Sequence, residues 1–358
     1  MGFVSIRPFN FRNLQDVRVD CDAPQVFLIG DNGQGKTNFI EAVHLLCYGS
    51  SFRTRTDRRL VRHGAEEASV DGTLRVDGGV EVEVSIRIGR EKEIRLNGKP
   101  VKDRADLLGN VPCIVFSHED FDFVNGPPER RRWFLNQTLS LSDALYLPAL
   151  RMYRRVLSAR NIVLRQRDAA LLEHYDQQLA AHGFEVQSRR ESALRGFSSV
   201  FSRLFGVVSG LSKDVRLEYL PSWQGIDGPE AAAAALRRRR DLDLRFGSTT
   251  HGPHRDSYVF LCEDGEFSHI ASTGQLRLCS LMLRVAQAHY LLELTGRKPI
   301  LLLDDVILEL DSRRRRAFVQ NLPDRDQAFF TFLSDEDYAT YRQTPSITYR
   351  VRDGRIEA

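Results

Sequence analysis

The sequence predicts an α/β protein whose sheet is assembled from both ends of the chain, with a helical lobe inserted between them. Two short apolar runs, at 25–29 and 299–303, have the length and composition of buried strands. The first leads through a glycine-rich loop into a helical pattern over 36–48, and the second ends in two aspartates. We expect a head formed by residues 1–125 and 247–358, and a helical lobe at 126–246.

The composition is that of an ordinary globular chain of about two domains. Of the 358 residues, 42% are hydrophobic and 28% are charged. No run approaches the length of a membrane span, and the first residues lack the apolar core of a secretory signal, so we expect a cytoplasmic protein without a membrane partner. The five cysteines include no C-x-x-C pair, which argues against a disulfide framework or a zinc site.

A β meander is expected after the first helix. Apolar residues occupy every second position from 80 to 88, which is typical of a strand with one buried face. Turn signals at 77–79 (Asp-Gly-Gly) and 97–98 (Asn-Gly) divide the segment 69–101 into antiparallel strands. A further apolar run lies at 111–116.

The central part of the chain has a different pattern. It opens with the breaker Gly126-Pro127-Pro128, and long helical patterns follow at 146–172 and 174–205. An alanine-rich pattern from 231 leads into four arginines at 237–240. Such a run is more often a solvated helix face than a binding site. These patterns predict the inserted helical lobe.

The segment after the first apolar run matches the G-x-x-x-x-G-K-[ST] pattern of phosphate-binding loops. Its glycines let successive backbone N–H groups turn toward phosphate oxygens, and the following helix adds its positive N-terminal end. The lysine of this pattern reaches the β- and γ-phosphates, and the hydroxyl joins the Mg²⁺ shell. The residues are Gly30, Asp31, Asn32, Gly33, Gln34, Gly35, Lys36 and Thr37.

The second apolar run ends in the pair Asp304 and Asp305. Beside a phosphate-binding loop, the first acid serves the Mg²⁺ shell and the second is placed to act as general base toward the attacking water. Alone, the pair is equally well explained as a helix cap or a turn. Lys36 and Asp304 are 268 residues apart, whereas a compact small-molecule kinase keeps such strands close in sequence.

A second candidate anion site opens the helical pattern that precedes the acidic strand. It consists of Ser272, Thr273, Gly274 and Gln275, which we call the signature. A serine and a glycine at a helix N-terminus favour an anion, and the first loop already forms a complete phosphate cradle. The second site is therefore most useful for the γ-phosphate of another molecule, which predicts a head-to-tail homodimer with ATP at its interface. Taken alone, the segment is more typical of an ordinary helix cap.

These features resemble the ATPase heads of ABC-type proteins, with a mixed sheet and an antiparallel β subdomain, and more closely the RecF family of DNA-repair proteins. The resemblance runs along nearly the whole chain. Its most specific part is FSHEDFDFVNGPPERRRWFLN at 116–136, which generic ATPase heads lack. It also includes FNFRNL at 9–14, SFRT at 51–54, GPHRD at 252–256 and LLLDDVILELD at 301–311.

The resemblance implies a function in recombinational DNA repair and the SOS response. RecF-like proteins bind ATP and Mg²⁺, dimerise through the signature helix, and bind double-stranded DNA near single-strand gap junctions. They act with RecO and RecR to assist the loading of RecA. The resemblance implies the same cofactors and partners for this chain.

The resemblance also implies roles for single residues. Asp305 takes the place of the usual catalytic Glu, beside Lys36, while Thr37 and Asp304 hold Mg²⁺. The remaining assignments are Arg12, Asn13 and Asn38 for the nucleotide, and Glu309 and Asp311 for a loop that crosses the dimer interface.

Departures from other ABC heads predict slow hydrolysis. No glutamine lies between 113 and 124, where those heads place a Mg²⁺-contacting Gln, so His118 or Glu119 is the candidate substitute. Thr331 stands where transporters carry a switch His. Because the base is also one methylene shorter than Glu, we interpret ATP as a dimerisation switch more than as fuel.

Arginines concentrate at the start of the lobe. The whole chain carries a net charge of only +3, but residues 129–167 hold nine arginines and two acids. No motif for reading base edges is present, so we expect salt-sensitive contacts to the DNA backbone without sequence preference. A solvated helix face explains any one of them equally well. The candidate DNA-binding residues are Arg130, Arg131, Arg132, Arg151, Arg154 and Arg155.

Three alternatives stay open at this point. The ATPase subunit of a transporter is disfavoured by the weak signature, the missing switch His and the large helical insertion. A small-molecule kinase with a phosphate-binding loop is disfavoured by the signature and by the distant Asp304. A long-armed chromosome-organising protein would need a much longer insertion with an extended heptad run.

Overall fold

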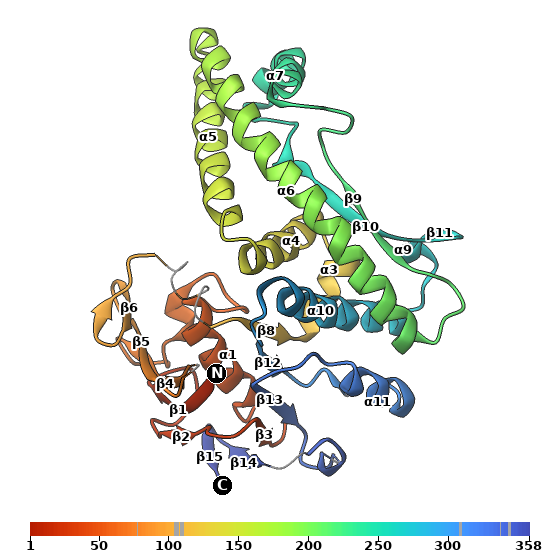
Figure 1. The fold of residues 1–358 in the computed structure, drawn as a ribbon. Helices are drawn as coiled ribbons and strands as arrows, with labels where there is room; N and C mark the ends of the chain where they lie inside the picture. Colours follow the sequence, from red (N-terminus) through yellow and green to blue (C-terminus); the bar gives the residue numbers. More distant parts are fainter. Residues whose placement is uncertain (77, 104–106, 108–110, 308–309, 337, 343–344) are drawn as a thin grey trace. The chain divides into compact units, whose positions relative to one another are not determined.

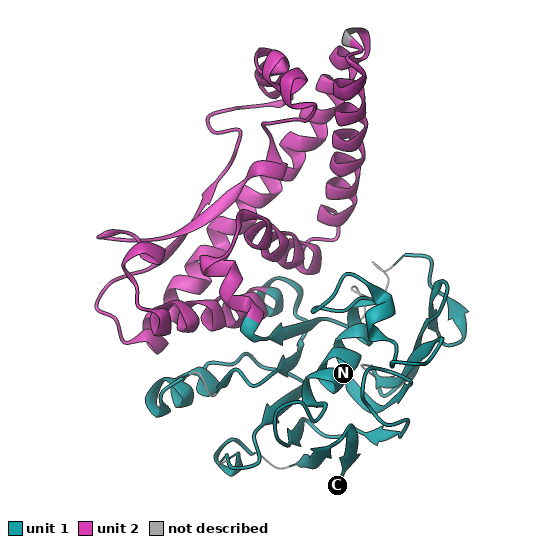
Figure 2. Ribbon diagram, turned by 180° about the vertical axis from the view of Figure 1, so that it is seen from behind, with its two compact units in different colours: residues 1–118, 291–358 teal, residues 119–290 magenta. Residues whose placement is uncertain are grey.

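A computed structural model describes residues 1–76, 78–103, 107, 111–307, 310–336, 338–342 and 345–358 (Figure 1). The chain forms two compact units (Figure 2). Unit 1 comprises Met1–His118 and Leu291–Ala358, and unit 2 comprises Glu119–Tyr290. Unit 1 is therefore built from the two ends of the chain, with unit 2 inserted between them.

The central sheet of unit 1 is mixed, with the strand order β15-β14-β3-β13-β12-β8. Adjacent strands from β14 to β8 are parallel, and β15 pairs with β14 antiparallel. Every residue of β3, β8, β12 and β13 is buried, which is why these strands are largely apolar in the sequence. The strands are β3 (Gln25–Ile29), β8 (Cys113–Phe116), β12 (Ile300–Leu303), β13 (Gln327–Phe332), β14 (Ser346–Arg352) and β15 (Arg355–Glu357).

A second sheet of unit 1 is antiparallel, in the order β2-β1-β4-β5-β6-β7. Alternate residues of β5 are buried, as the pattern predicts, although Val80 lies before the strand and is 59% exposed. The predicted Asn97-Gly98 turn joins β6 to β7, and both residues have positive φ. Asp77, at the other predicted turn, lies outside the described residues. The strands are β1 (Gly2–Phe9), β2 (Val19–Asp20), β4 (Ala68–Arg75), β5 (Glu81–Ile88), β6 (Lys92–Leu96) and β7 (Lys99–Pro100).

Helix α1 (Lys36–Tyr48) contacts both sheets of unit 1. It meets β4 and β5 of the antiparallel sheet and β8 and β13 of the mixed sheet. Apolar side chains therefore surround almost its whole circumference, and the helix is buried from Phe39 to Tyr48. Helix α11 (Ser312–Gln320) and the 3₁₀ helices η1 (Asp57–Leu60) and η5 (Ala339–Tyr341) complete the described helices of the unit.

Unit 2 is mainly helical and includes the segment 126–246. The long helices α5 and α6 contact each other, and α7 contacts α6. Its helices are α3 (Asp122–Asn125), α4 (Pro128–Ser142), α5 (Tyr146–Gln166), α6 (Ala169–Ser209), α7 (Pro229–Arg238), α8 (Arg240–Phe246), η3 (Pro253–Arg255) and α9 (Phe267–Ile270). The helix η2 (His118–Phe121) begins at the division between the units, and α10 (Thr273–Thr295) crosses it.

The structure divides the chain at different positions from the sequence. The sequence assigns 119–125 and 247–290 to the head, whereas the structure groups both with unit 2. The physical reason is a third sheet, in which β10 (Ser257–Cys262) pairs antiparallel with β9 (Arg216–Leu220) and β11 (Gly265–Glu266). This long-range pairing ties the segment after 247 to the lobe.

Two further expectations concern the cysteines and membrane-spanning helices. All five cysteines are free thiols. Among the described residues, no helix is long and apolar enough to cross a membrane.

Candidate functional site

The glycine-rich loop lies between the end of β3 and the start of α1 in unit 1, the arrangement that the sequence predicts. Gly33 and Gly35 have φ of 79° and 119°, values that residues with a Cβ rarely adopt. Gly30 has no room for a side chain, because a Cβ there would lie 2.2 Å from the Val351 carbonyl oxygen. The glycines thus shape a tight loop at the N-terminus of α1, where backbone N–H groups favour an anion.

Lys36 is held inside this loop. Its side chain is 3% exposed, and Nζ donates hydrogen bonds to the carbonyl oxygens of Gly30 (2.6 Å) and Asp31 (3.2 Å). Nζ also lies 3.6 Å from Asp305 Oδ2. The structure therefore brings the loop lysine and the predicted general base together.

Thr37 and Asp304 meet directly. Thr37 Oγ1 donates a 2.8 Å hydrogen bond to Asp304 Oδ1. Burial raises the pKa of Asp304 to about 6, while the hydrogen bond from Thr37 lowers it and the charge of Asp305 raises it. A hydroxyl and a carboxylate are the hard oxygen ligands that Mg²⁺ prefers, and a carboxylate disfavoured by burial gains from a nearby cation. These two residues therefore fit a Mg²⁺ ion.

Asp305 has an unusual backbone conformation, with φ of 54°. Its N–H donates to Thr331 Oγ1 at 2.7 Å, and Thr331 Oγ1 lies 2.7 Å from Asp305 Oδ1. Thr331, on β13, thus contacts the acid directly. From the sequence, Thr331 is notable only because it stands where transporters carry a switch His.

The predicted nucleotide residues outside the loop also lie against it. Asn13 Nδ2 donates to the Gly33 carbonyl at 3.3 Å, and Asn38 Nδ2 donates to Asn13 Oδ1 at 2.6 Å. Arg12 makes a bidentate ion pair with Glu41 of α1, with distances of 2.9 and 3.0 Å. Arg12, Asn13 and Asn38 therefore form one network beside the loop.

Glu41 is a residue of this network that the sequence reasoning missed. Its side chain is fully buried, and it also accepts hydrogen bonds from Ser51 Oγ (2.5 Å) and Arg53 Nη1 (3.4 Å). Arg53 additionally donates to Asn38 Oδ1 at 2.8 Å. Two features of the sequence could have identified Glu41: it is one acid within an apolar helix, and the SFRT segment lies at 51–54.

A turn near the C-terminus supports the loop as well. The N–H groups of Asp353 and Gly354 donate to Gln34, at Oε1 (2.7 Å) and the carbonyl oxygen (2.8 Å). A Cβ at Gly354 would lie 1.8 Å from the Asn13 carbonyl oxygen, so only glycine fits. The turn between β14 and β15 therefore packs directly on the phosphate-binding loop.

The chain is similar to known proteins along nearly its whole length. A family model described as RecF/RecN/SMC N terminal domain matches residues 4–355. The protein named "DNA replication and repair protein RecF" from Treponema pallidum (strain Nichols) is 40% identical over 347 residues, covering 96% of this chain and 98% of that protein. The chain belongs to the RecF family.

Two further similarities support this assignment. The RecF of Symbiobacterium thermophilum (strain DSM 24528 / JCM 14929 / IAM 14863 / T) is 34% identical over 359 residues, 97% of this chain and 95% of that protein. A solved structure described as the recombination mediator protein RecF-ATP in the RecFOR pathway is 29% identical, with a TM-score of 0.89 over 99% of this chain and 97% of the other. The predicted fold class, an ABC-type ATPase head, is confirmed.

The signature of this RecF-family chain lies in unit 2, at the start of α10. The Ser272 N–H donates to Gln275 Oε1 (2.7 Å), and the Gln275 N–H donates to Ser272 Oγ (3.3 Å), which is a capping box. Ser272, Thr273 and Gly274 are exposed. Three residues of the signature are thus presented to solvent at the positive end of α10.

The predicted interface loop is described only in part. Glu309 lies outside the described residues. Asp311 is the N-cap of α11, and its side chain accepts from the N–H groups of Arg313 and Arg314 at 3.1 and 3.0 Å. Asp311 therefore has a local structural role.

The candidate DNA-binding arginines fall into two groups. Arg130 pairs with Glu119 and Asp122, at 3.2 and 3.3 Å. Arg131 and Arg132 donate to the carbonyl oxygens of residues 258 and 256, at 3.2 and 3.0 Å. By contrast, the three candidate arginines on α5 have exposed side chains. These are Arg151, Arg154 and Arg155.

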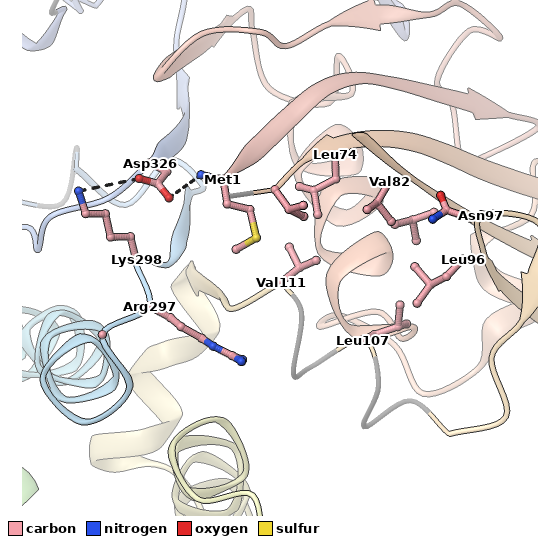
Figure 3. Close-up of a pocket in the computed structure, with 13 residues that line it drawn as sticks. Met1, Leu74, Val82, Leu96, Asn97, Leu107, Val111, Arg297, Lys298 and Asp326 are labelled. Carbon is pink, nitrogen blue, oxygen red and sulfur yellow. Dashed lines mark hydrogen bonds and ion pairs between the residues drawn. The ribbon is translucent and has the colours of Figure 1, made fainter. Parts of the chain in front are cut away.

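A cavity of about 670 Å³ lies elsewhere in unit 1 (Figure 3). Side chains such as Leu74, Val82 and Leu96 of the antiparallel sheet form its apolar wall. At its other end the N-terminal amine of Met1 pairs with Asp326 at 2.6 Å. Its lining includes no residue of the phosphate-binding loop or of the acidic pair, so it is separate from the nucleotide site.

Proposed function

We propose that this chain is an ATP-dependent DNA-binding protein of recombinational repair. Binding of ATP and Mg²⁺ drives head-to-tail dimerisation, and the dimer clamps double-stranded DNA at single-strand gap junctions without sequence preference. Slow ATP hydrolysis opens the dimer. In this function it acts with RecO and RecR and assists RecA loading. The "RecFOR pathway" in the description of the 29%-identical structure supports these partners.

One observation carries the proposal. Lys36 and Thr37 come from the N-terminal part of the chain, and Asp304 and Asp305 come from the C-terminal part. The fold brings them within 2.8 Å (Thr37 to Asp304) and 3.6 Å (Lys36 to Asp305) of each other. A lysine, a hydroxyl and two carboxylates around a glycine-rich loop are the set that binds a nucleoside triphosphate with Mg²⁺.

Each residue then has a definite task. The loop N–H groups and Lys36 bind the β- and γ-phosphates, and Thr37 and Asp304 hold Mg²⁺. The ion neutralises charge on the phosphates when it is bound. Asp305 accepts a proton from the attacking water and has the shorter reach of an aspartate, so hydrolysis is slow and ATP acts mainly as a switch.

The exposed signature supports dimerisation through ATP. A second chain can place its bound γ-phosphate against the exposed N-terminus of α10, where Ser272 and Gly274 offer a hydroxyl and a backbone N–H. Ser272 would then touch only the partner's ATP. Its replacement should block dimer closure without changing ATP binding by one chain.

The test is fluorescence anisotropy on a short labelled duplex, with ATP–Mg²⁺ and without nucleotide. We expect ATP to tighten DNA binding by wild type but not by Ser272→Arg. Gln177→Arg is the matched control, because it adds the same charge at an exposed position of α6 in the same unit. If wild type binds no duplex at moderate salt with ATP present, the proposal that the isolated chain binds DNA is wrong.

A further inference from the structure

We infer that Thr331 is a positioning residue for ATP hydrolysis, whose hydroxyl orients the carboxylate of Asp305 toward the nucleotide. The inference rests on the proposed function, because it assigns a role beside the proposed general base. It gives Thr331 a task that the sequence does not indicate.

The contacts of Thr331 form a closed ring with Asp305. The Asp305 N–H donates to Thr331 Oγ1 at 2.7 Å, and the hydroxyl donates back to Asp305 Oδ1 at 2.7 Å. Thr331 is only 3% exposed, so these bonds have little competition from water. The backbone and the side chain of Asp305 are thus held by one oxygen atom.

The single proton of the hydroxyl goes to Asp305. Two other acceptors, Asp304 Oδ1 and the Leu303 carbonyl oxygen, each lie 3.4 Å from Thr331 Oγ1, which is too far to compete with a 2.7 Å contact. Asp304 already receives the hydroxyl of Thr37 at 2.8 Å. Thr331 therefore acts on the proposed base and leaves the proposed Mg²⁺ ligands in place.

Asp305 needs such support for two reasons. Its φ of 54° is uncommon for a residue with a side chain, and surrounding contacts must hold it. Thr331 occupies Oδ1, so Oδ2, which lies 3.6 Å from Lys36 Nζ, is the oxygen that faces the phosphate-binding loop. Because an aspartate is short, its ability to take a proton from water near the γ-phosphate depends on this orientation.

The variant Thr331→Val isolates the hydroxyl, because valine has nearly the same shape and also favours a strand. We expect single-turnover ATP hydrolysis to slow by about 10- to 100-fold, the usual effect of losing such a supporting contact. The ATP dissociation constant in Mg²⁺ should stay within about twofold, which separates positioning from ground-state binding. Thr331→Ser keeps the hydroxyl and should restore most of the rate.

A double-mutant cycle tests whether Thr331 acts through Asp305. In an Asp305→Asn background, Thr331→Val should cause no further loss of rate. If Thr331→Val hydrolyses ATP at the wild-type rate, or loses ATP binding, the positioning role is overturned while the proposed function stands. If wild type itself neither binds nor hydrolyses ATP, both are overturned, so the two failures are distinguishable.

Discussion

Lys36 Nζ lies 3.6 Å from Asp305 Oδ2, which joins the phosphate-binding loop to the end of the acidic strand. The Lys36 side chain is 3% exposed, and its ammonium group also donates to the Gly30 and Asp31 carbonyl oxygens. A buried cation with these partners is already placed where the phosphates of a nucleotide are expected. Binding of a triphosphate would exchange weaker oxygen partners for charged ones.

Replacement of this lysine should strongly weaken nucleotide binding. We expect Lys36→Ala to weaken ATP binding at least about 30-fold, since removal of one partner of a buried charge pair costs about 2–5 kcal/mol. Titration with a fluorescent ATP analogue measures the effect. Lys92→Ala is the control, because Lys92 pairs with Asp57 in the same unit, at 2.7 Å, and lies outside the loop. Equal affinities of Lys36→Ala and wild type would place the nucleotide elsewhere.

The hydroxyl of Thr37 should determine the Mg²⁺ dependence of ATP binding. Thr37→Val removes an oxygen ligand at nearly constant shape, so we expect Mg²⁺ to improve ATP affinity about tenfold less than in wild type. The measurement compares ATP affinity in Mg²⁺ with affinity in EDTA. Thr37→Ser should behave as wild type. A full Mg²⁺ effect in Thr37→Val would exclude this hydroxyl as a ligand.

The head could be predicted because its central strands are buried on both faces. Such strands are nearly continuous apolar runs, so the segments at 25–29 and 299–303 are visible in the sequence without any alignment. The loop and the aspartates then follow from chemistry, since a phosphate site with Mg²⁺ needs both. In the structure β13 lies between β3 and β12, and because these three strands are parallel, the carboxyl ends of β3 and β12 lie at the same end of the sheet.

The contacts that support the loop could not be predicted in the same way. Glu41 is one acid in an apolar helix, and only the fold shows that Arg12 and Arg53 lie beside it. The turn at 353–354 has no local pattern that indicates which loop it touches. The grouping of the segment after 247 with unit 2 is hard to predict for a related reason, because the pairing of β10 with β9 depends on tertiary structure.

Arg160 should contribute strongly to the stability of unit 2. It is fully buried, with Asp176 and Asp243 each at 2.7 Å, and so ties α5 to α6 and α8. We expect Arg160→Met to lower the free energy of unfolding by about 3–5 kcal/mol, because the buried carboxylate of Asp243 loses its cation and that of Asp176 keeps only Arg240, at 2.6 Å. Arg155→Met, at an exposed position of α5, should change it by less than about 0.5 kcal/mol.

Tryptophan fluorescence measures the stability loss of Arg160→Met in unit 2. Both tryptophans, Trp133 and Trp223, lie in unit 2. Urea unfolding followed at this signal therefore reports on unit 2 alone. Equal urea midpoints for Arg160→Met and Arg155→Met would contradict a stabilising role of the buried ion pairs.

The stability of unit 2 should fall in mild acid because of His254. Its Nδ1 lies 2.6 Å from the Tyr153 hydroxyl, and its Nε2 lies 2.9 Å from the Thr249 carbonyl oxygen. Burial lowers the pKa of His254 to about 4, from an ordinary value of 6.5. Between these values the unfolded chain binds the proton more tightly, so stability is full above pH 6.5 and is lost as pH falls toward 4.

The size of this loss is on the order of 3 kcal/mol for a shift of this kind. Urea unfolding at pH 7, 6 and 5 measures it through tryptophan fluorescence. His254→Gln removes the titrating group, so its stability should change less with pH than that of wild type. The difference between the two proteins cancels the contributions of other groups, such as Asp256, whose pKa burial raises. Parallel pH curves would show that His254 is not responsible.

Exposed arginines of α5, rather than those at 130–132, should contribute most to DNA affinity. Arg154 and Arg155 are exposed, whereas the charge of Arg130 is already matched by Glu119 and Asp122. We expect Arg154→Gln and Arg155→Gln each to weaken duplex binding and to reduce the slope of log affinity against log salt by about 1, equally for two unrelated sequences. Arg130→Gln should have a smaller effect, because its release from two acids offsets part of any phosphate contact. Anisotropy over a salt series measures both quantities. If only the substitution of Arg130 lowers the slope, the DNA-binding surface lies at the start of α4 instead of on α5.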